Sequence, residues 1–508
     1  MFKSNEFYDW KVIRQTIFTI VAVFAAMKFT RGFGFAIVIP FTLMALFQNR
    51  VEKLLFWILF ANMLVVTNDF FAPKNIVFAA GYRGLLTGVG LYGILLFFSV
   101  KSSKLVLPLL GIFAYLFYMI LPSLQGWAPM VSILKLVMFG STYMALAFIS
   151  TKAQASSSLN IRNIRSFMLA FCIVYIVGSV LVYPVPAISM MNAEEMLRSV
   201  GTATSLYKGM TNHSQTLGMF VCCWMAFLMG DWFLNVQKKD KLYLGLILCG
   251  VFLILKTSSR TAMGSLLVTV VFLTYNMMQA RGMNSRWKSK VVSTLMVFFV
   301  LAAAALIAIP SARDAVARKA MKWGANETTA ETFTVEKAVS SRMGLVDYSL
   351  YLWKLKPMIG WGFQVDPRVG EMERKSGGFV LSAPIEKGVW ITAMLEEGGV
   401  FGEIIYVTYM LFAFFALLMN RAYLGATVFL LIHVSNMGEF TMFSMSGVGC
   451  VWYSVLFTSL VFDAMRLRGG MRPGSGLPPF GPPPVGFGLG PRIGRRLGPG
   501  PMMGKKRV

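Results

Sequence analysis

Long apolar segments recur along almost the whole of this 508-residue chain, and they restrict its fold more than any other feature. A helix needs roughly 20 apolar residues to cross a bilayer, and hydropathy indicates about fourteen such segments. Only 14% of the residues are charged, against about a quarter in a typical soluble domain. We therefore expect an all-α integral membrane protein, a polytopic bundle of about 12–14 transmembrane helices with one large, partly helical outer loop.

The expected spans lie near residues 15–30, 33–48, 53–71, 82–100, 104–122, 128–150, 165–187, 213–235, 241–256, 260–280, 290–310, 391–418, 422–437 and 443–464. Residues 1–190 are predicted to form an N-terminal transmembrane bundle. The stretch MFKSNEFYDWKVIRQ leads into the first span with no small-residue cleavage site after it, so we expect no cleavable signal peptide.

Positive charge is concentrated in alternate loops and in the C-terminal tail. The formal net charge is +26, but the excess follows the positive-inside rule and does not indicate nucleic-acid binding. The basic loops should face the cytoplasm, which places both termini inside and Arg260 outside. The tail, 465–508, is basic and rich in glycine and proline, so we expect it to be disordered. Its charge weakly favours contact with anionic membrane lipids of the inner leaflet.

Metal and cofactor sites are not expected. All five cysteines fall inside apolar segments, in no pattern typical of a metal site or a loop disulfide. The chain has only two histidines, His213 and His433, which makes a histidine-based metal site improbable.

The segment KTSSRTA (256–262) places Arg260 and several hydroxyls between two apolar segments, on the predicted outer side. A guanidinium matches phosphate with two parallel hydrogen bonds, and hydroxyls add donors. The alternative is an arginine at a span end that reaches the lipid headgroups. The same two alternatives apply to Arg83, which begins another span on that side in AAGYRGLLTG.

The segment KGMTNHSQTLG (208–218) begins a span from the predicted outer side. Here His213 and Gln215 could hydrogen-bond a sugar or a phosphate, and His213 could act as an acid or base near neutral pH. The alternative is a polar cap at the start of a helix.

Residues 311–390 form the one large polar segment, which topology places outside. Apolar residues recur at three- and four-residue spacing over 341–357, which predicts an amphipathic helix that Pro357 ends. Arg342 should open this helix, where the helix dipole would favour a nearby phosphate. The alternative is a solvated arginine that pairs with Asp347.

Acidic residues accompany the last spans. In APIEKGVWITAMLEEGGVFGE (383–403), Glu386 and Lys387 precede a span whose start contains Glu396 and Glu397. Carboxylates at that depth cost free energy unless they take part in function or are paired with a cation. The alternative is that these acids only lie at a helix start, where negative charge is favoured. Glu439 lies in a short turn between the last two spans and is either a site residue or an ordinary loop acid.

These candidates share one predicted side of the membrane. Arg83, His213, Arg260, Arg342, Glu386 and Glu439 all map to the outer face. A transport pathway would instead distribute polar groups through the bilayer midplane. The order of the segments KGMTNHSQTLG, KTSSRTA and SRMGLVDYSLYLWKLKPMIGWGF resembles the bacterial O-antigen ligase and O-antigen polymerase family. EEGGVFGEII is similar to that family's acidic, glycine-rich start of a span, and the resemblance covers about residues 200–410.

The resemblance implies a glycosyltransferase of the GT-C type, with 191–464 as its catalytic region. Such enzymes take a glycan from a polyprenyl pyrophosphate at the outer face of the bacterial inner membrane and pass it to a saccharide or lipid acceptor. Arg260 and Arg342 match the family's arginines, which hold the pyrophosphate without a metal or another cofactor. Ligase-type members carry a histidine where this chain reads SAPIEKGVW; here Glu386 would accept the acceptor's proton and Lys387 would join the phosphate clamp. His213, Gln215, Arg83 and Glu439 would contact substrate.

Alternatives stay open at this point. The missing histidine favours a polymerase or an unusual ligase. A flippase for lipid-linked glycans or another multi-span transporter would use Arg14, Lys28 and Lys135, which lie within or near spans. A non-catalytic protein that binds polyprenyl phosphate would need the arginines but not Glu386.

Overall fold

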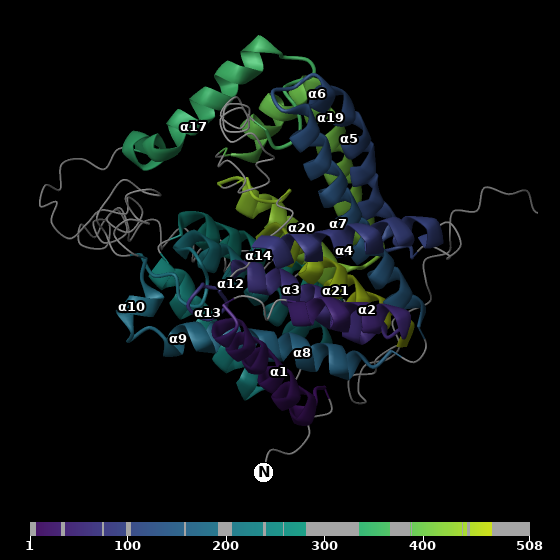
Figure 1. Cartoon of the computed structure of the whole chain (residues 1–508), viewed down its shortest axis with the longest axis vertical. Coiled ribbons are helices and arrows are strands. Elements are labelled where there is room, and N and C mark those ends of the chain that lie inside the picture. The colour runs from purple at the N-terminus through teal and green to yellow at the C-terminus, as the bar shows by residue number, and fades with distance from the viewer. Residues whose placement is uncertain are drawn as a thin grey trace, which may run out of the picture. The chain divides into compact units, whose positions relative to one another are not determined.

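The computed structural model consists of helices joined by short connections, with no strand in the residues it describes (Figure 1). The described residues are 7–31, 36–73, 76–97, 103–156, 159–191, 206–236, 240–257, 259–280, 335–365, 387, 389–438, 440–443 and 448–469. At 76–80, 96–97, 260, 280, 335–343 and 469 the description covers the backbone alone.

The N-terminal half of the described chain contains α1 (Trp10–Phe29), α2 (Val38–Phe47), α3 (Val51–Val66), α4 (Ile76–Phe97), η2 (Leu107–Gly111), α5 (Ile112–Tyr118), α6 (Ile120–Leu124), α7 (Pro129–Ala155), α8 (Ile161–Cys172), η3 (Ile173–Val177), α9 (Gly178–Leu181) and α10 (Pro186–Ser189). The C-terminal half contains α12 (Ser214–Asp231), η4 (Trp232–Val236), α13 (Lys241–Thr257), α14 (Arg260–Ala280), α17 (Val335–Leu355), α19 (Trp390–Met419), α20 (Tyr423–Asn436) and α21 (Val448–Gly469).

The helices confirm an all-α, multi-pass membrane protein. Every expected span from 15–30 to 260–280 and from 391–418 to 443–464 coincides with a helix or with consecutive helices, and the expected span 290–310 lies outside the described residues. Among the described residues, 8 helices are long and apolar enough to cross a membrane. Large apolar side chains such as Phe18, Phe29 and Phe47 are exposed on the outside of the helices, which suits lipid and not water.

Two expected boundaries are wrong. Arg342 does not open its helix, because α17 begins seven residues earlier at Val335; the helix-forming stretch VEKA extends the helix beyond the amphipathic pattern. The C-terminal end of α17 at Leu355 agrees with the expected stop at Pro357. The tail was expected from residue 465, but α21 continues to Gly469.

Connections between helices meet at two ends of the bundle. At one end the segment before α12 pairs with the end of α3, where Asn212 donates its N–H to the Val66 carbonyl at 3.0 Å. At the other end the N–H of Asn160, before α8, donates to the Glu52 carboxylate at 2.6 Å. α3 and α8 therefore begin at the same end of the bundle, and α12 begins at the other end. We call the first end the predicted outer end, since which end faces outward remains a prediction.

A buried ion pair fixes the N-terminal segment at the opposite end. Arg165 of α8 donates two hydrogen bonds to the Asp231 carboxylate, at 2.7 and 3.0 Å, and a third to the Phe7 carbonyl at 3.0 Å. Asp231 also accepts from Tyr243 at 2.6 Å and from Asn235 at 2.8 Å. The buried Arg165 thus joins α8, α12 and α13 through the Asp231 carboxylate.

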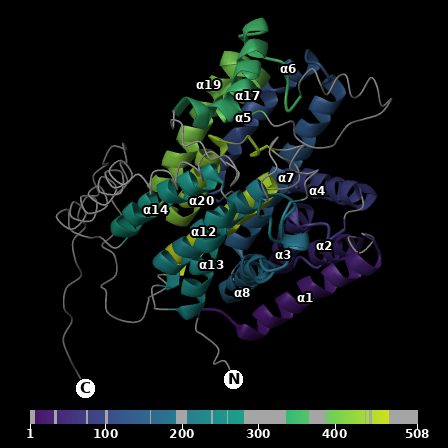
Figure 2. The same ribbon diagram turned by 90° about the vertical axis from the view of Figure 1, so that its left-hand side faces the viewer.

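Residues 1–471 form one compact unit. Within it α21 packs against α3 and α7, so helices from 1–190 and from 191–464 share one core. The division at residue 190 remains a prediction. Figure 2 shows the same helices from the side, with α17, α19, α5 and α6 together at one extremity and α1 and α8 away from them.

Candidate functional site

The start of α12 carries His213 and Gln215 at the predicted outer end. His213 has extended backbone geometry and precedes the first helical residue, and its Nδ1 accepts a hydrogen bond from the Gln215 N–H at 3.2 Å. This is the capping role that the sequence left as one alternative. Both side chains are half-exposed, so the cap does not remove them from contact with a ligand.

The KTSSRTA segment lies against the first turns of α12. A β-carbon added at Gly218 would lie 2.7 Å from Ser259 Cβ and 3.1 Å from Thr257 Oγ1. Only a glycine allows this approach without a shift of the neighbouring side chains. The Ser259 hydroxyl accepts from the Ala262 N–H at 3.3 Å and so caps α14, whose first residue is Arg260. The backbone of Arg260 therefore begins a helix directly beside the segment that carries His213.

The turn after α20 closes on the same segment. A β-carbon at Gly438 would lie only 2.2 Å from Thr261 Oγ1. One residue earlier in that turn, the Met437 sulfur accepts a hydrogen bond from Trp390 Nε1 at 2.7 Å. The turn thus joins the start of α14 to the start of α19, and Glu439 is the next residue after Gly438 in the sequence.

Arg83 belongs to α4 and is half-buried. Its side chain lies in the neighbourhood of Cys450, in the first turn of α21. Since α21 begins a few residues after the turn that contains Gly438, Arg83 also lies at the predicted outer end. Its role in substrate binding remains a prediction.

Lys387 lies in a buried cluster of charges before α19. Its ammonium is 2.9 Å from a carboxylate oxygen of Glu396 and 2.9 Å from one of Glu397, and it donates to the Val365 carbonyl at 2.9 Å. Burial alone would lower the pKa of Lys387, but the two carboxylates outweigh this effect and hold the pKa above its usual value. The lysine is therefore charged, and two carboxylates lie within ion-pair distance of it.

α19 is broken close to these carboxylates. Gly399 has φ 64° and ψ −168°, a conformation available essentially to glycine alone. The ring centroids of Trp390 and Tyr406 are 5.9 Å apart, although 16 residues of straight helix would span about 24 Å. The helix therefore bends sharply at Gly399 and its first turns run back beside the later ones.

The segment 357–365 fills the break in α19. The N–H groups of Val400 and Phe401 donate to the carbonyls of Pro357 and Met358 at 2.9 and 3.3 Å. In return, the carbonyls of Glu396 and Glu397 accept hydrogen bonds from the inserted residues Trp361 and Gly362. We refer to residues 357–365 as the inserted segment.

The inserted segment replaces several of the hydrogen bonds that the break removes from the helix. Trp361 donates its N–H to Glu396 O at 3.0 Å, and Gly362 donates to Glu397 O at 2.9 Å. Backbone polar groups near lipid must be satisfied inside the protein, and a non-helical segment is tolerated only where protein covers it. A β-carbon at Gly360 would lie 2.4 Å from Glu397 O, so the segment needs glycine at this position too.

Side chains of α6 and α7 complete this packing. Ser132 donates to the Phe363 carbonyl at 2.9 Å, and Ser123 accepts from the Phe363 N–H at 3.1 Å. Lys135 is buried and donates to the Gln364 carbonyl at 2.8 Å. Two lysines, Lys135 and Lys387, therefore hold consecutive carbonyls of the inserted segment, and no residue in this packing can move without its neighbours.

α17 is attached to the same structure near its C-terminal end. Ser349 donates its hydroxyl to the Glu396 carboxylate at 2.6 Å. The indole of Trp361 donates to the Leu352 carbonyl at 2.7 Å. Arg342 precedes Ser349 by seven residues in the same helix, which is about two turns or roughly 10 Å. The position of α17, and with it the backbone of Arg342, is thus set by contacts to α19 and the inserted segment.

The structure describes the predicted site residues to different extents. It describes the side chains of Arg83, His213, Gln215 and Lys387; for Arg260 and Arg342 it describes the backbone alone. Glu386 and Glu439 lie outside the described residues. The convergence of the two guanidinium groups on one pyrophosphate therefore remains a prediction.

Sequence reasoning missed the pairing of Lys387 with Glu396 and Glu397, the attachment of Ser349 and the break at Gly399. The glycines of EEGGVFGE and IGWGF were the available signal, because the positive-φ glycines Gly360, Gly362 and Gly399 lie in these two stretches. In the described part of the chain no three His, Cys, Asp or Glu side chains come together as metal ligands.

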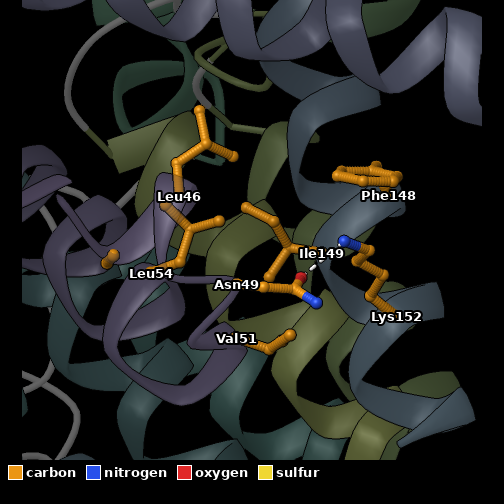
Figure 3. Close-up of a pocket in the computed structure, with 8 residues that line it drawn as sticks. Leu46, Asn49, Val51, Leu54, Phe148, Ile149 and Lys152 are labelled. Carbon is orange, nitrogen blue, oxygen red and sulfur yellow. Dashed lines mark hydrogen bonds between the residues drawn. The ribbon is translucent and has the colours of Figure 1, made fainter. Parts of the chain in front are cut away.

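A small pocket lies far from this site, between the α2–α3 connection and the end of α7 (Figure 3). Apolar residues line it, and Lys152 donates a hydrogen bond to Asn49 at its edge, at 2.6 Å. Lys152 follows Lys135 by 17 residues in α7, about 25 Å along the helix. The pocket is therefore at the end opposite to the candidate site.

No protein-family model matches the chain, and no curated protein matches its sequence.

Proposed function

We propose that the protein is a membrane glycosyltransferase that moves a glycan from a polyprenyl pyrophosphate to a saccharide or lipid-linked acceptor at the outer face of a bacterial inner membrane. The observation that carries the proposal is the meeting of three segments at the predicted outer end. The α12 start with His213, the α14 start with Arg260 and the turn at Gly438 are in contact there.

Catalysis in this proposal comes from stabilising charge on the leaving group. As the bond between the sugar C1 and the pyrophosphate oxygen breaks, negative charge grows on the phosphate oxygens. Arg260 and Arg342 would donate hydrogen bonds to those oxygens, and fixed donors of this kind stabilise the transition state more than the ground state. Glu386 would accept the proton of the attacking acceptor hydroxyl. Arg83, His213, Gln215 and Glu439 would orient the substrates.

The hydroxyls beside Arg260 suit this role. Ser259 is occupied as the cap of α14, whereas Thr261 faces the turn at Gly438. The start of a helix carries partial positive charge from its unpaired N–H groups, which favours a bound phosphate. An arginine at the first position of α14 therefore adds its full charge to a place that already attracts anions.

A transporter or flippase for a lipid-linked glycan is the second candidate, favoured by the broken helix α19 and by a buried polar pair. Broken helices with exposed backbone groups form substrate sites in many transporters. Tyr406 and His433 are also buried between α19 and α20, hydrogen-bonded at 2.9 Å.

The placement of the break argues for the enzyme. The later arm of α19, Val400–Met419, has 20 residues and spans about 30 Å, which is the thickness of the hydrocarbon core. Gly399 therefore lies near an edge of the apolar layer, whereas transporters place such breaks near the midplane. The inserted segment also occupies the backbone groups of the break, so they are not open to a substrate.

The deciding experiment is glycosyl transfer by the purified full-length chain in detergent. The protein is incubated with a polyprenyl-pyrophosphate-linked glycan and an acceptor saccharide, and released polyprenyl pyrophosphate is measured. We expect release without an ion gradient, its loss in Arg260→Ala, and full retention in Lys152→Met at the opposite end. If the wild-type protein releases nothing but moves the intact lipid-linked glycan across proteoliposome membranes, the transporter is the correct assignment.

A polymerase and a ligase would be separated in cells. A deletion strain that makes single, short glycan repeats has lost polymerisation, whereas one that accumulates intact free polymer has lost ligation.

A further inference from the structure

The charges around Lys387 connect three separate parts of the chain. Lys387 itself precedes α19, Glu396 and Glu397 lie in its first arm, and the Val365 carbonyl ends the inserted segment. Ser349 adds α17 through its hydrogen bond to Glu396 at 2.6 Å. Removal of Lys387 leaves two buried carboxylates without their cation.

Lys387 is poorly suited to hold a phosphate in this arrangement. Its ammonium donates a hydrogen bond to the Val365 carbonyl and lies 2.9 Å from one carboxylate oxygen of Glu396 and 2.9 Å from one of Glu397. The side chain is buried, with a relative exposure of 4%. A phosphate brought to this lysine would also meet two carboxylates, and like charges at such distances repel strongly in a buried site.

We propose that Lys387, Glu396, Glu397 and Ser349 form a positioning cluster that fixes α17, and thereby Arg342, to the broken helix α19. The relation to Arg342 rests on the proposed function; the attachment of α17 does not. α17 has few other anchors among the described contacts: Trp361 holds the Leu352 carbonyl, and Trp353 donates to the Pro357 carbonyl at 3.0 Å. All of these lie in the last two turns of the helix.

Because of this geometry, the positioning cluster sets the direction in which α17 points. In the described contacts α17 is held at its C-terminal turns, so a small rotation of this helix at Ser349 displaces a residue seven positions earlier by a larger amount. Misplacement of a catalytic group by about 1 Å can cost a hundredfold in rate. The positioning cluster should therefore affect turnover without contacting the substrate.

The attachment is tested first by hydrogen–deuterium exchange of the purified full-length protein in detergent. In Lys387→Met we expect the amides of 345–355 to exchange at least about tenfold faster, because a buried carboxylate that loses its partner favours local opening. The amides of α12 and α21 should be unchanged. Lys387→Arg should keep most of the protection, and Lys152→Met is the matched control. Unchanged exchange of 345–355 in a folded Lys387→Met protein overturns the proposal.

A second variant covers the case in which Lys387→Met does not fold. The combination Lys387→Met, Glu396→Gln and Glu397→Gln removes the buried charges together, which is tolerated better than the loss of one partner. Faster exchange confined to α17 in this variant supports the cluster as the anchor of the helix. Wild-type protection of α17 in it overturns the proposal.

The link to Arg342 is tested by kinetics. Lys387→Met should lower kcat by about tenfold or more with the donor KM within about threefold, whereas a lost phosphate contact would raise the donor KM. In an Arg342→Ala background, adding Lys387→Met should lower kcat by less than about threefold, because Lys387 acts through a group that is already absent. Multiplicative losses would place Lys387 in the substrate site instead. If the wild-type protein transfers no glycan, the proposed function fails while the exchange result still decides the attachment.

Discussion

Trp361 donates its backbone N–H to the carbonyl of Glu396, 3.0 Å away, and so replaces a hydrogen bond that α19 loses at Gly399. The two residues come from a polar loop and from an apolar span, and neither stretch could adopt its conformation alone. The break would leave unsatisfied polar groups at the edge of the membrane, which cost several kcal/mol each in lipid. The inserted segment would have no fixed structure without the break.

Gly399→Ala should destabilise the protein by roughly 1–3 kcal/mol, the usual cost of forcing such a conformation on another residue. Its β-carbon would also lie 2.2 Å from the Met358 carbonyl oxygen. The thermal unfolding midpoint in detergent should fall. Gly245→Ala is the matched control, because nothing lies within 4 Å of a β-carbon there and alanine favours a helix by up to about 1 kcal/mol. Equal midpoints for the two variants would contradict the described break.

Asp231→Asn should lower stability by about 3–5 kcal/mol, since it leaves the buried Arg165 guanidinium without its carboxylate. The N-terminal segment should loosen as well, because Arg165 holds the Phe7 carbonyl. Thermal unfolding and proteolysis near residue 7 measure the two effects. Asp347→Asn, on the exposed face of α17, should change neither the thermal unfolding nor the proteolysis near residue 7. If Asp231→Asn leaves both unchanged, the ion pair contributes little to stability.

Gly218→Ala should reduce glycosyl transfer by about tenfold while leaving most of the stability intact. The added β-carbon would push Ser259, which precedes Arg260, by a few tenths of an ångström or more, and displacement of this order affects catalytic geometry. Transfer rate and unfolding midpoint are compared in one preparation. Full activity would mean that the contact between α12 and α14 does not position Arg260.

Arg260→Lys should slow glycosyl transfer by roughly a hundredfold, because lysine keeps the charge but loses the two parallel hydrogen bonds to phosphate. Initial rates of polyprenyl pyrophosphate release provide the measurement. Lys152→Arg, at the end of the bundle opposite to the candidate site, is the control and should have the wild-type rate. Normal turnover of Arg260→Lys would exclude the bidentate contact.

Glu386→Gln should sharply lower turnover and leave donor binding nearly unchanged, because the amide cannot accept the acceptor's proton. Turnover is measured with saturating acceptor, and donor affinity with the purified variant in detergent. A variant with wild-type turnover would remove Glu386 from the mechanism and leave the base unidentified.

The amino-acid sequence by itself determined the class of fold and the order of the helices. Spans are local: about 20 apolar residues must cross the bilayer as a helix wherever their neighbours lie. For this reason helices lie at the expected spans within the described residues, and 8 of these helices are long and apolar enough to cross a membrane. The sequence also identified the segments that meet at the predicted outer end, because alternation of spans fixes the side on which each connection emerges.

The tertiary structure alone decided which charges pair and where a helix breaks. The glycines of EEGGVFGE permit a bend but do not require one. The bend at Gly399 exists because residues 357–365, distant in sequence, supply hydrogen bonds that the helix gives up. Likewise Lys387 was expected to meet phosphate, yet it lies against Glu396 and Glu397. A side chain's partner depends on packing between distant segments, and a single sequence contains no record of that packing.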